Sequence, residues 1–312
     1  MNREEYAVFI NTSANNGRAE KRWGKIKELV TNRLPPSTHY IEYSPPFDLM
    51  STVASLWEQN VSNFIAVGGD GSLFYLLNAL MPLNDGSRPM SVGAIGLGSS
   101  NDFCKTNSAK VDGYKFRIGK SKSAIVDVGS VTIDDGTSSF QKYFFSNASI
   151  GYLANANAYF NSNNSIVDFL KKGAVDLAIN YTAIASLWSH KNQSLALDFN
   201  DDQHTYNIST LSILKSPHVA GDFRYPSQIS PDDGTFDLKV CWDHSKWQLL
   251  RTLLRLYRKK FEGKNLASYS TDRLTIASDT AFFLELDGEI FNAVKANFKV
   301  LPRNITVLNF FD

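Results

Sequence analysis

The segment Gly68-Gly69-Asp70-Gly71-Ser72 has residue types and a spacing that suit a phosphorylated ligand. It follows the apolar run Phe64–Val67 and precedes a helical pattern of leucines that begins at Leu73. Glycines let a ligand approach the backbone closely, and the amides at the start of a helix favour an anion. A carboxylate there would repel a bare anion, but it fits if Mg²⁺ lies beside the phosphates. The segment therefore indicates nucleotide binding with metal-assisted phosphoryl transfer.

Three further polar segments could take part in the same chemistry. Gly96 to Phe103 again follows a predicted strand, and its serines and asparagine can donate to phosphate. Ser230–Asp237 mixes acidic side chains with carbonyl groups, which are the ligands of hard cations. Phe283–Glu289 ends in a turn with two carboxylates, and a carboxylate near a substrate hydroxyl can accept its proton. Taken singly, an Asp-Gly turn is more often a plain hairpin.

In the first third of the chain, predicted strands alternate with predicted helices, as in a parallel sheet covered on both faces. The strands are Tyr6–Ile10, His39–Tyr43, Phe64–Val67 and Ser91–Ile95, and the helices are Ala19–Arg33, Leu49–Gln59 and Leu73–Met81. Ligands of such sheets bind beyond the carboxyl ends of the strands. The loop that begins at Asn11 and the Gly68 turn both belong to that edge.

From about residue 125 the predicted strands follow one another with turns between them, which is typical of antiparallel sheets packed as a sandwich. They are Ile125–Ile133, Phe140–Ser149, Ser194–Phe199, His204–Leu214, Phe236–Cys241, Arg273–Ser278, Ala281–Leu286, Phe298–Leu301 and Ile305–Phe310. Helices are predicted at about Ile166–Trp188 and Ser245–Phe261. The predicted fold class is α/β plus mainly β, with a parallel α/β nucleotide-binding domain at 1–124 and a β-sandwich domain at 125–301.

Composition and charge narrow the class of protein. Of the 312 residues, 43% are hydrophobic and 20% are charged, which is ordinary for a globular protein. The net charge of +1 gives no electrostatic case for nucleic acid. Cys104 and Cys241 lack metal-site spacing, and reduced buried thiols are the simpler interpretation. No signal-peptide pattern and no membrane-spanning apolar run is found, so we expect a cytoplasmic location.

A cluster of basic residues marks the second predicted helix of the β-rich region. We interpret it as a solvated helix face in preference to a membrane-facing patch. The cluster consists of Arg251, Arg255, Arg258, Lys259 and Lys260.

The polar segments, taken in this order, resemble those of the diacylglycerol kinase catalytic-domain family, which includes bacterial lipid kinases and sphingosine kinases. The family pattern runs GGDGT, PLGTGNDF, I-D-x-G, N-x-x-S-x-G-[FY], D-G-x-x-D and a late DGE. The corresponding segments here are Gly68–Ser72, Gly96–Phe103, Val126–Gly129, Asn147–Tyr152, Asp233–Asp237 and Asp287–Glu289. The joint order spans nearly the full length and is far more specific than any one motif.

The chain departs from this pattern within both glycine turns. Ser72 keeps the hydroxyl of the usual threonine, and Phe74-Tyr75 replace a usual Asn-Glu pair. In the second turn, Gly96 replaces the proline of the family pattern, Ser99 replaces its threonine and Ser100 replaces its glycine. Ser100 brings a side chain into a turn where the family has none, which could reposition the phosphates or weaken ATP binding.

The resemblance implies a two-domain lipid kinase that uses ATP and Mg²⁺, with its active site in the cleft between domains and a last strand, about 302–312, that returns to the first domain. Asp70 would organise the catalytic Mg²⁺, and Glu289 would be the general base with Asp287 beside it. Ser230, Asp233 and Thr235 would hold a structural cation. The implied nucleotide-binding residues are Asn11, Ser13, Ser44, Gly68, Gly69, Asp70, Gly71, Ser72, Gly98, Ser99 and Asn101.

The resemblance also implies a lipid substrate presented at a membrane surface, with peripheral membrane contact and no nucleic acid partner; a homodimer is left open. Tyr181, Ile184, Leu187 and Trp188 could line the lipid entrance, although core packing is the simpler explanation. The acceptor lipid stays open among diacylglycerol, phosphatidylglycerol, monoacylglycerol, a sphingoid base and an undecaprenyl-type alcohol.

Two alternatives to a lipid kinase follow from the same residues. NAD kinases also carry a GGDG turn and 6-phosphofructokinases carry GGDGS, but neither predicts the Gly96–Phe103 turn together with the late Asp-Gly-Glu. A lipid-binding relative that has lost catalysis is the other alternative. The retained Asp70 and Glu289 argue against it, because a binding protein needs no general base.

Overall fold

A computed structural model describes residues 5–106, 108–162, 164–167, 170, 175–221 and 223–309. The chain divides into two compact units, residues 1–126 with 303–312 and residues 127–302. The expected boundaries lie within two residues of this division, and the last residues belong to the first unit. Strands β7 (Gly119–Asp134) and β17 (Glu289–Asn309) carry the chain from one unit into the other.

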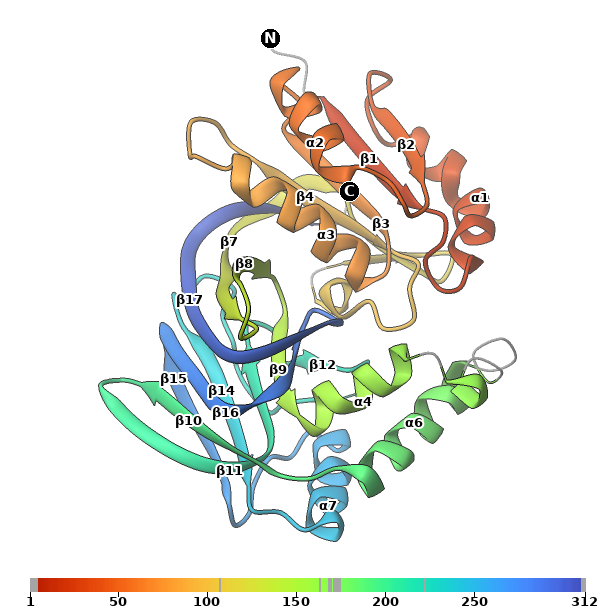
Figure 1. Ribbon diagram of the computed structural model, residues 1–312. Coiled ribbons are helices and arrows are strands. Elements are labelled where there is room, and N and C mark those ends of the chain that lie inside the picture. Colours follow the sequence, from red (N-terminus) through yellow and green to blue (C-terminus); the bar gives the residue numbers. More distant parts are fainter. Residues whose placement is uncertain are drawn as a thin grey trace. The chain divides into compact units, whose positions relative to one another are not determined.

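The first unit contains a parallel sheet in the order β2–β1–β3–β4 (Figure 1). Along the outer edge of β4, Ser91 and Val92 pair in parallel with the end of β17, while Ala94 to Gly96 pair antiparallel with β6. The strands are β1 (Tyr6–Asn11), β2 (His39–Tyr43), β3 (Asn63–Gly68), β4 (Ser91–Gly96), β5 (Ala109–Val111) and β6 (Tyr114–Arg117).

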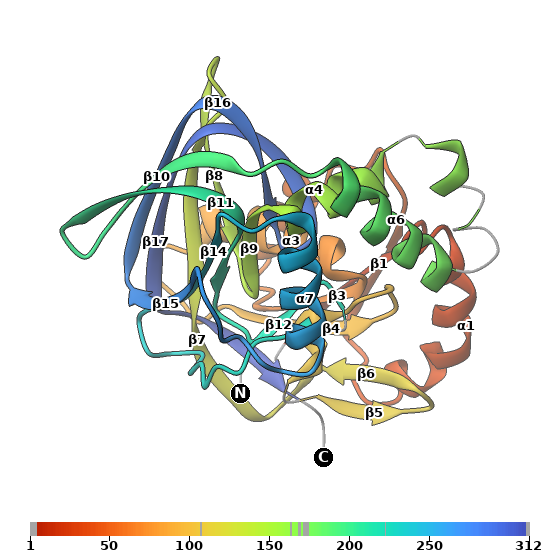
Figure 2. The same ribbon diagram turned by 90° about the horizontal axis from the view of Figure 1, so that it is seen from below.

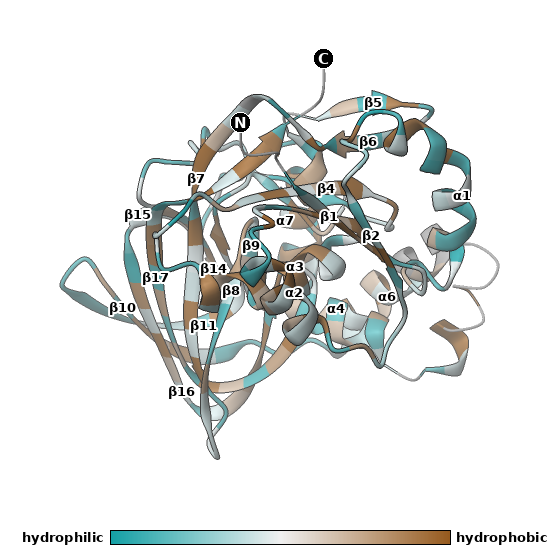
Figure 3. Cartoon of the chain, turned by 90° about the horizontal axis from the view of Figure 1, so that it is seen from above, coloured by the Kyte–Doolittle hydropathy of each residue, from teal (hydrophilic) through white to brown (hydrophobic). Residues whose placement is uncertain are grey.

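Helices cover both faces of this sheet because side chains of a buried strand alternate between them. Ile65 of β3 packs in a core cluster with Trp23 of α1. Its neighbour Phe64 points to the other face and contacts the Trp57 ring of α2, with centroids 6.5 Å apart. The outer face of α1 is hydrophilic, and most of this helix is teal in Figure 3. The helices are α1 (Arg18–Thr31), α2 (Leu49–Glu58) and α3 (Asp70–Leu80), with 3-10 turns η1 (Met81–Leu83) and η2 (Asp102–Lys105).

The second unit is built mainly from antiparallel strands in the order β15–β14–β11–β10–β16–β17, with β7 pairing β17 and β8. The strands β9 and β10 lie end to end between β11 and β16, because each of these long strands pairs with both. The strands are β8 (Ser139–Phe144), β9 (Asn147–Gly151), β10 (Gln193–Phe199), β11 (Asp202–Leu214), β12 (His218–Val219), β13 (Phe223–Arg224), β14 (Phe236–Trp242), β15 (Leu266–Thr271) and β16 (Arg273–Leu286).

Aromatic rings fill the sandwich interior, and helices close one side of it. The Phe144 ring stacks on Phe236 and meets Phe298 edge-on. Gly129 lies against Phe144, where a Cβ would come within 2.4 Å of the ring. The helices α4 (Tyr152–Asn161), α6 (Val175–Ser189) and α7 (Lys246–Tyr257) form a cluster with β14 that is visible in Figure 2.

Several observed elements differ from those predicted. No element was predicted for the asparagine-rich segment that forms α4, a helix that buries Tyr152 and Leu153. The predicted strand Phe140–Ser149 is two strands, and the predicted helix Ile166–Trp188 includes residues outside the described ones. β17 is continuous through Pro302. Pro302 lies between the part of β17 that pairs with β16, which reaches Lys299, and the part that pairs with β4, which begins at Thr306.

Candidate functional site

The two glycine turns of the first unit are locked against each other. The backbone amides of Leu97 and Gly98 both donate to the Gly68 carbonyl, at 2.7 and 3.0 Å. A Cβ on Gly98 would come within 2.5 Å of the Gly69 Cα, so a side chain at this position would clash with backbone. The turns therefore form one rigid unit at the carboxyl ends of β3 and β4.

Side chains from both turns fix this arrangement. Asn101 has a left-handed backbone (φ 53°); its Oδ1 accepts from the Gly98 amide at 2.9 Å, and its Nδ2 donates to the Gly98 carbonyl at 3.0 Å. Asp70, the first residue of α3, accepts from the Phe103 amide at 3.3 Å. The N-cap residue Gly69 has no side chain to cap the first turn of α3, which leaves a helix start of the kind that binds anions.

The loop after β1 joins the same site. Asn11 Nδ2 donates to Ser72 Oγ at 3.0 Å, and Asn11 Oδ1 accepts from the exposed Ser13 hydroxyl at 2.7 Å. Burial raises the pKa of Tyr43 to about 12, an effect opposed by a hydrogen bond with Ser72. Ser44 is exposed directly after β2. The structure thus gathers the predicted nucleotide-binding residues at the carboxyl edge of one parallel sheet, with Gly71 in the first turn of α3 and Ser99 exposed.

Two arginines that the sequence analysis did not select support the second turn. Arg22 of α1 donates to the carbonyls of Leu97 and Gly98, at 2.8 and 3.3 Å. Arg117 is buried, and its guanidinium donates to the Phe103 carbonyl and to Asn309 Oδ1, each at 3.1 Å. Burial lowers the pKa of Arg117 to about 10, against an opposing contribution from Cys104. For Arg117, the signal that the sequence offered is its position between two apolar residues, both of which are buried in the structure.

The late Asp-Gly-Glu motif forms the tight turn between β16 and β17. Asp287 and Gly288 both have positive φ (45° and 96°), which suits a two-residue hairpin turn. The Asp287 carboxylate is buried and accepts from three backbone amides, those of Phe145, Ser146 and Asn147, at 2.7, 2.9 and 3.0 Å. Asp287 therefore anchors the break between β8 and β9.

Glu285 fixes the same turn from the preceding strand. Its Oε1 accepts from the Gly288 amide and its Oε2 from the Ser149 hydroxyl, each at 2.6 Å. Asn157 of α4 donates to the Gly288 carbonyl at 2.8 Å. Glu289 follows this fixed turn and is partly exposed. Its backbone thus follows a turn that two buried carboxylates fix, Glu285 from the strand before the turn and Asp287 from within it.

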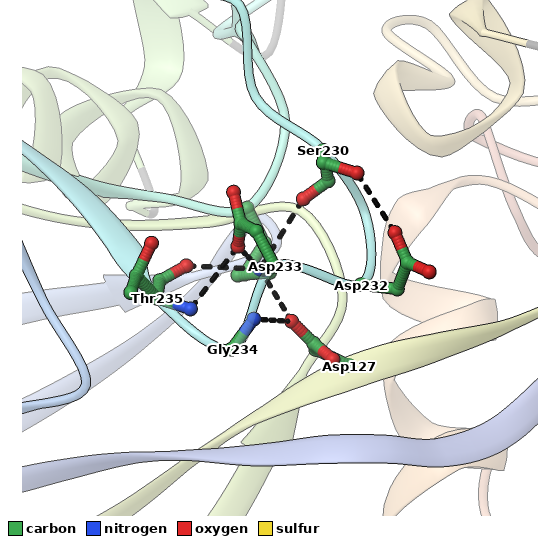
Figure 4. A network of polar contacts seen from close by, with 7 residues as sticks. Asp127, Ser230, Asp232, Asp233, Gly234 and Thr235 are labelled. Atoms are coloured by element: carbon green, nitrogen blue, oxygen red, sulfur yellow. Dashed lines mark hydrogen bonds and ion pairs between the residues drawn. The ribbon is translucent and has the colours of Figure 1, made fainter.

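The oxygens predicted to hold a structural cation instead surround an ammonium group. Lys215 Nζ lies 2.7 Å from Asp127 Oδ2, 2.8 Å from Asp233 Oδ1, 2.9 Å from the Thr235 carbonyl and 3.4 Å from the Ser230 carbonyl. Figure 4 shows these acceptors converging. A metal ion bound to them at 2.0–2.6 Å would occupy the place of Nζ. In this arrangement Ser230, Asp233 and Thr235 do not fit a metal ion.

The remaining described residues offer no replacement site. Among them, no group of three or more His, Cys, Asp or Glu side chains lies together as a metal site would need. Lys215 was missed in the sequence, although a lysine that ends the apolar strand run Leu211–Leu214 was a usable signal.

Comparison with known proteins shows which class of protein this is: its members have a catalytic domain followed by a β-sandwich domain. Residues 5–131 match the family model of the diacylglycerol kinase catalytic domain. Residues 147–309 match that of the YegS C-terminal NAD kinase beta sandwich-like domain. The chain therefore belongs to the diacylglycerol kinase catalytic-domain family, a family of lipid kinases, with a YegS-type C-terminal domain. The predicted fold class is confirmed.

Individual relatives are distant in sequence but match over most of their length. The chain is 25% identical to the "Probable lipid kinase YegS-like" of Shewanella frigidimarina (strain NCIMB 400), over 83% of this chain and 80% of that protein. It is 24% identical to the "Diacylglycerol kinase" of Bacillus subtilis (strain 168), over 78% and 76%. A crystal structure of a diacylglycerol kinase from Bacillus anthracis str. Sterne has the same fold, with a TM-score of 0.65, 15% identity and coverage of 98% and 97%.

One further structural observation bears on membranes. Within the described part of the chain, no helix has both the length and the apolar character that crossing a bilayer requires.

Proposed function

We propose that this protein is an ATP-dependent lipid kinase that transfers the γ-phosphate to a lipid hydroxyl. The observation that carries the proposal is the pair of interlocked glycine turns with Asp70 at the start of α3, in a chain of a lipid kinase family. Rigid glycine turns and a helix start together suit a nucleotide phosphate chain.

Different residues of the first unit would contact the phosphates, hold Mg²⁺ and support the second turn. The phosphates would lie against the first turn of α3, with Asn11, Ser72 and the exposed hydroxyls of Ser13 and Ser99 as further donors. Asp70 would hold Mg²⁺, which neutralises charge that develops on the phosphates. Arg22 and Arg117 act indirectly, because they keep the second turn in its shape.

In the second unit we assign the general base to Glu289 and a positioning role to Asp287. A carboxylate beside the acceptor hydroxyl takes up its proton during phosphoryl transfer. The Asp287 carboxylate is occupied by three backbone amides, so proton transfer is better suited to Glu289.

A surface on α6 and α7 supports contact with the membrane that holds the lipid. We call it the Trp247 face. The Trp188 and Trp247 rings meet edge-on at 5.4 Å, although the residues are 49% and 67% exposed. On α7 the exposed apolar residues Leu254 and Tyr257 continue from Trp247 at helical spacing, opposite the buried residues Leu249, Thr252, Leu253 and Leu256.

The basic residues beside this apolar stripe favour an anionic bilayer as its partner. From Ser245 to Phe261 the chain has no acidic residue, and the exposed basic residues are Lys246, Arg251, Arg255, Arg258, Lys259 and Lys260. Exposed tryptophans beside basic residues are typical of a helix that lies in the interface of a membrane. The exposed apolar stripe therefore favours membrane contact over the solvated face expected from the charges alone.

The decisive experiment combines purified protein, radiolabelled ATP, Mg²⁺ and mixed micelles of each candidate lipid alcohol. We expect a labelled lipid product with the wild type and none with Asp70→Asn. In parallel assays with NAD or fructose 6-phosphate as the acceptor, labelled NADP or labelled fructose bisphosphate without any lipid product would favour the small-molecule kinase alternative. Lipid binding without any labelled product would identify an inactive relative and overturn the proposal.

The membrane contact has its own experiment. Vesicles of phosphatidylcholine with and without phosphatidylglycerol should capture the wild type only when phosphatidylglycerol is present. Trp247→Glu should reduce capture by roughly tenfold or more, because it removes apolar burial and adds repulsion. Met50→Glu, at another 60% exposed apolar position, is the matched control and should bind as the wild type does. Equal capture of wild type and Trp247→Glu would exclude the Trp247 face.

A further inference from the structure

The ammonium group of Lys215 is enclosed by oxygens in a manner that resembles a bound cation. The Lys215 side chain is 1% exposed, and Asp127 beside it is fully buried. The three shortest contacts of Nζ, 2.7 to 2.9 Å, match the three N–H donors of an ammonium group. The ammonium group thus has every donor satisfied and two carboxylates as counter-charges.

We call the oxygens of Asp127, Asp233, Thr235 and Ser230 around Lys215 Nζ the cage. The cage also joins three distant segments of the second unit. Asp127 lies in β7, Lys215 follows β11, and the loop Ser230–Thr235 leads into β14. Asp127 Oδ2 also accepts from the Gly234 amide at 2.8 Å, and the Asp127 amide donates to the Pro231 carbonyl at 2.8 Å. The loop is therefore tied to β7 from both sides, and Lys215 supplies the charge at the centre.

We propose that Lys215 is a built-in cation that replaces a structural metal ion, so that the loop Ser230–Thr235 keeps its shape without metal. A metal ion and Nζ cannot share the cage, because both require the same oxygens at bonding distance. Losing the ammonium group leaves the buried Asp127 carboxylate and the partly exposed Asp233 carboxylate without their counter-charge, which is strongly unfavourable for the buried one.

The first test uses the wild-type protein, with thermal unfolding as the readout and no dependence on kinase activity. Addition of a chelator, or of Ca²⁺ or Mg²⁺ at millimolar concentration, should leave the transition of the second unit within about 1 °C, since no ion binds the folded cage. A chelator that lowers the wild-type Tm, with no such fall in Asp233→Asn, would show a bound metal and overturn the proposal.

The second test removes the ammonium group. Lys215→Met keeps the length of the side chain without its charge and should lower the Tm by on the order of 10 °C. An unchanged Tm would show that the ammonium group does not hold the loop. Lys239→Met is the matched control, because Lys239 is also largely buried and paired with Asp237, but on β14 outside the cage.

The third test asks whether the emptied cage accepts a metal ion. Lys215→Ala should gain a Ca²⁺ site, detected by calorimetry and by a Tm increase of roughly 5–10 °C at a saturating concentration. Adding Asp233→Asn should abolish that gain, and Lys239→Ala should never acquire it. No Ca²⁺ response in folded Lys215→Ala would mean that the oxygens are not a cation cage. If Lys215→Ala fails to fold, the thermal unfolding of the wild type with chelator and with added metal still tests whether the cage binds a metal ion.

Discussion

Gly98 lies so close to Gly69 that a Cβ on Gly98 would come within 2.5 Å of the Gly69 Cα. This contact joins the two glycine turns without any side chain between them. It explains why glycine is required at position 98 even though its φ is not positive. The requirement comes from the space between two backbones and not from backbone conformation.

Gly98→Ala should therefore push the two turns apart, lower stability by about 1–3 kcal/mol and weaken binding of a non-hydrolysable ATP analogue. Gly24→Ala is the control, since Gly24 lies in α1 with nothing within 4 Å of an added Cβ, and it should preserve or raise stability. Calorimetric titration and thermal unfolding measure both effects. Wild-type ATP affinity in Gly98→Ala would show that the contact between the turns is unimportant for the nucleotide.

Asp70→Asn should leave the fold intact and lower kcat by at least ~10²-fold, because the carboxylate that anchors Mg²⁺ is lost. Asp48 offers a matched control, since it begins α2 in the same unit and its side chain accepts from the Ser51 amide. Asp48→Asn keeps a capping oxygen and should leave kcat unchanged. Steady-state rates at saturating ATP and lipid test this, and a wild-type kcat in folded Asp70→Asn would contradict the assigned role.

The two acidic residues of the late turn should separate chemistry from structure. Glu289→Gln should spare stability and ATP binding while reducing phosphoryl transfer by about 10²–10⁴-fold, because glutamine cannot take up a proton. Asp287→Asn should instead lower the Tm, because the buried carboxylate accepts from three amides. Loss of ATP affinity in Glu289→Gln with normal turnover at saturating ATP would make Glu289 a nucleotide contact.

Ser100 tests the departure of this chain from the family pattern. Its hydroxyl oxygen is buried and makes no hydrogen bond with any residue that the structure describes. Ser100→Ala should therefore be neutral or stabilising, by up to about 1 kcal/mol. Ser100→Gly removes the side chain from the turn and should raise ATP affinity. Weaker ATP binding in both variants would show that the Ser100 hydroxyl is a useful ligand contact.

The stability that Asp233 contributes should depend on pH. Burial alone would raise the pKa of Asp233, but hydrogen bonds from Lys215 and the Thr235 amide outweigh it and lower the pKa. A lowered folded-state pKa means that this stability is present above the unfolded pKa, about 3.9, and is lost as pH falls through the folded value. The Tm difference between wild type and Asp233→Asn should therefore be constant from pH 7 to 5 and shrink below pH 4. A difference that grows on acidification would contradict the pairing with Lys215.

Much of the first unit could be predicted because its signals are local. The run Phe64–Val67, the glycine turn and the leucine pattern after it specify β3, its turn and α3 within a single stretch of chain. The nucleotide-binding residues lie at the carboxyl edge of the sheet for the same reason, since strand direction places every such loop there.

The remaining features depend on contacts between segments far apart in the chain, and only the tertiary structure decided them. An apolar run ending in Lys215 specifies β11, but nothing local shows that its ammonium group meets Asp127, 88 residues away, and Asp233. Likewise, Asp287-Gly288 specifies a tight turn, but its role as an anchor follows only from amides about 140 residues earlier. Local periodicity determines which elements form, whereas the pairing of buried charges is determined by packing, because a buried charge must find its partner wherever the fold brings one.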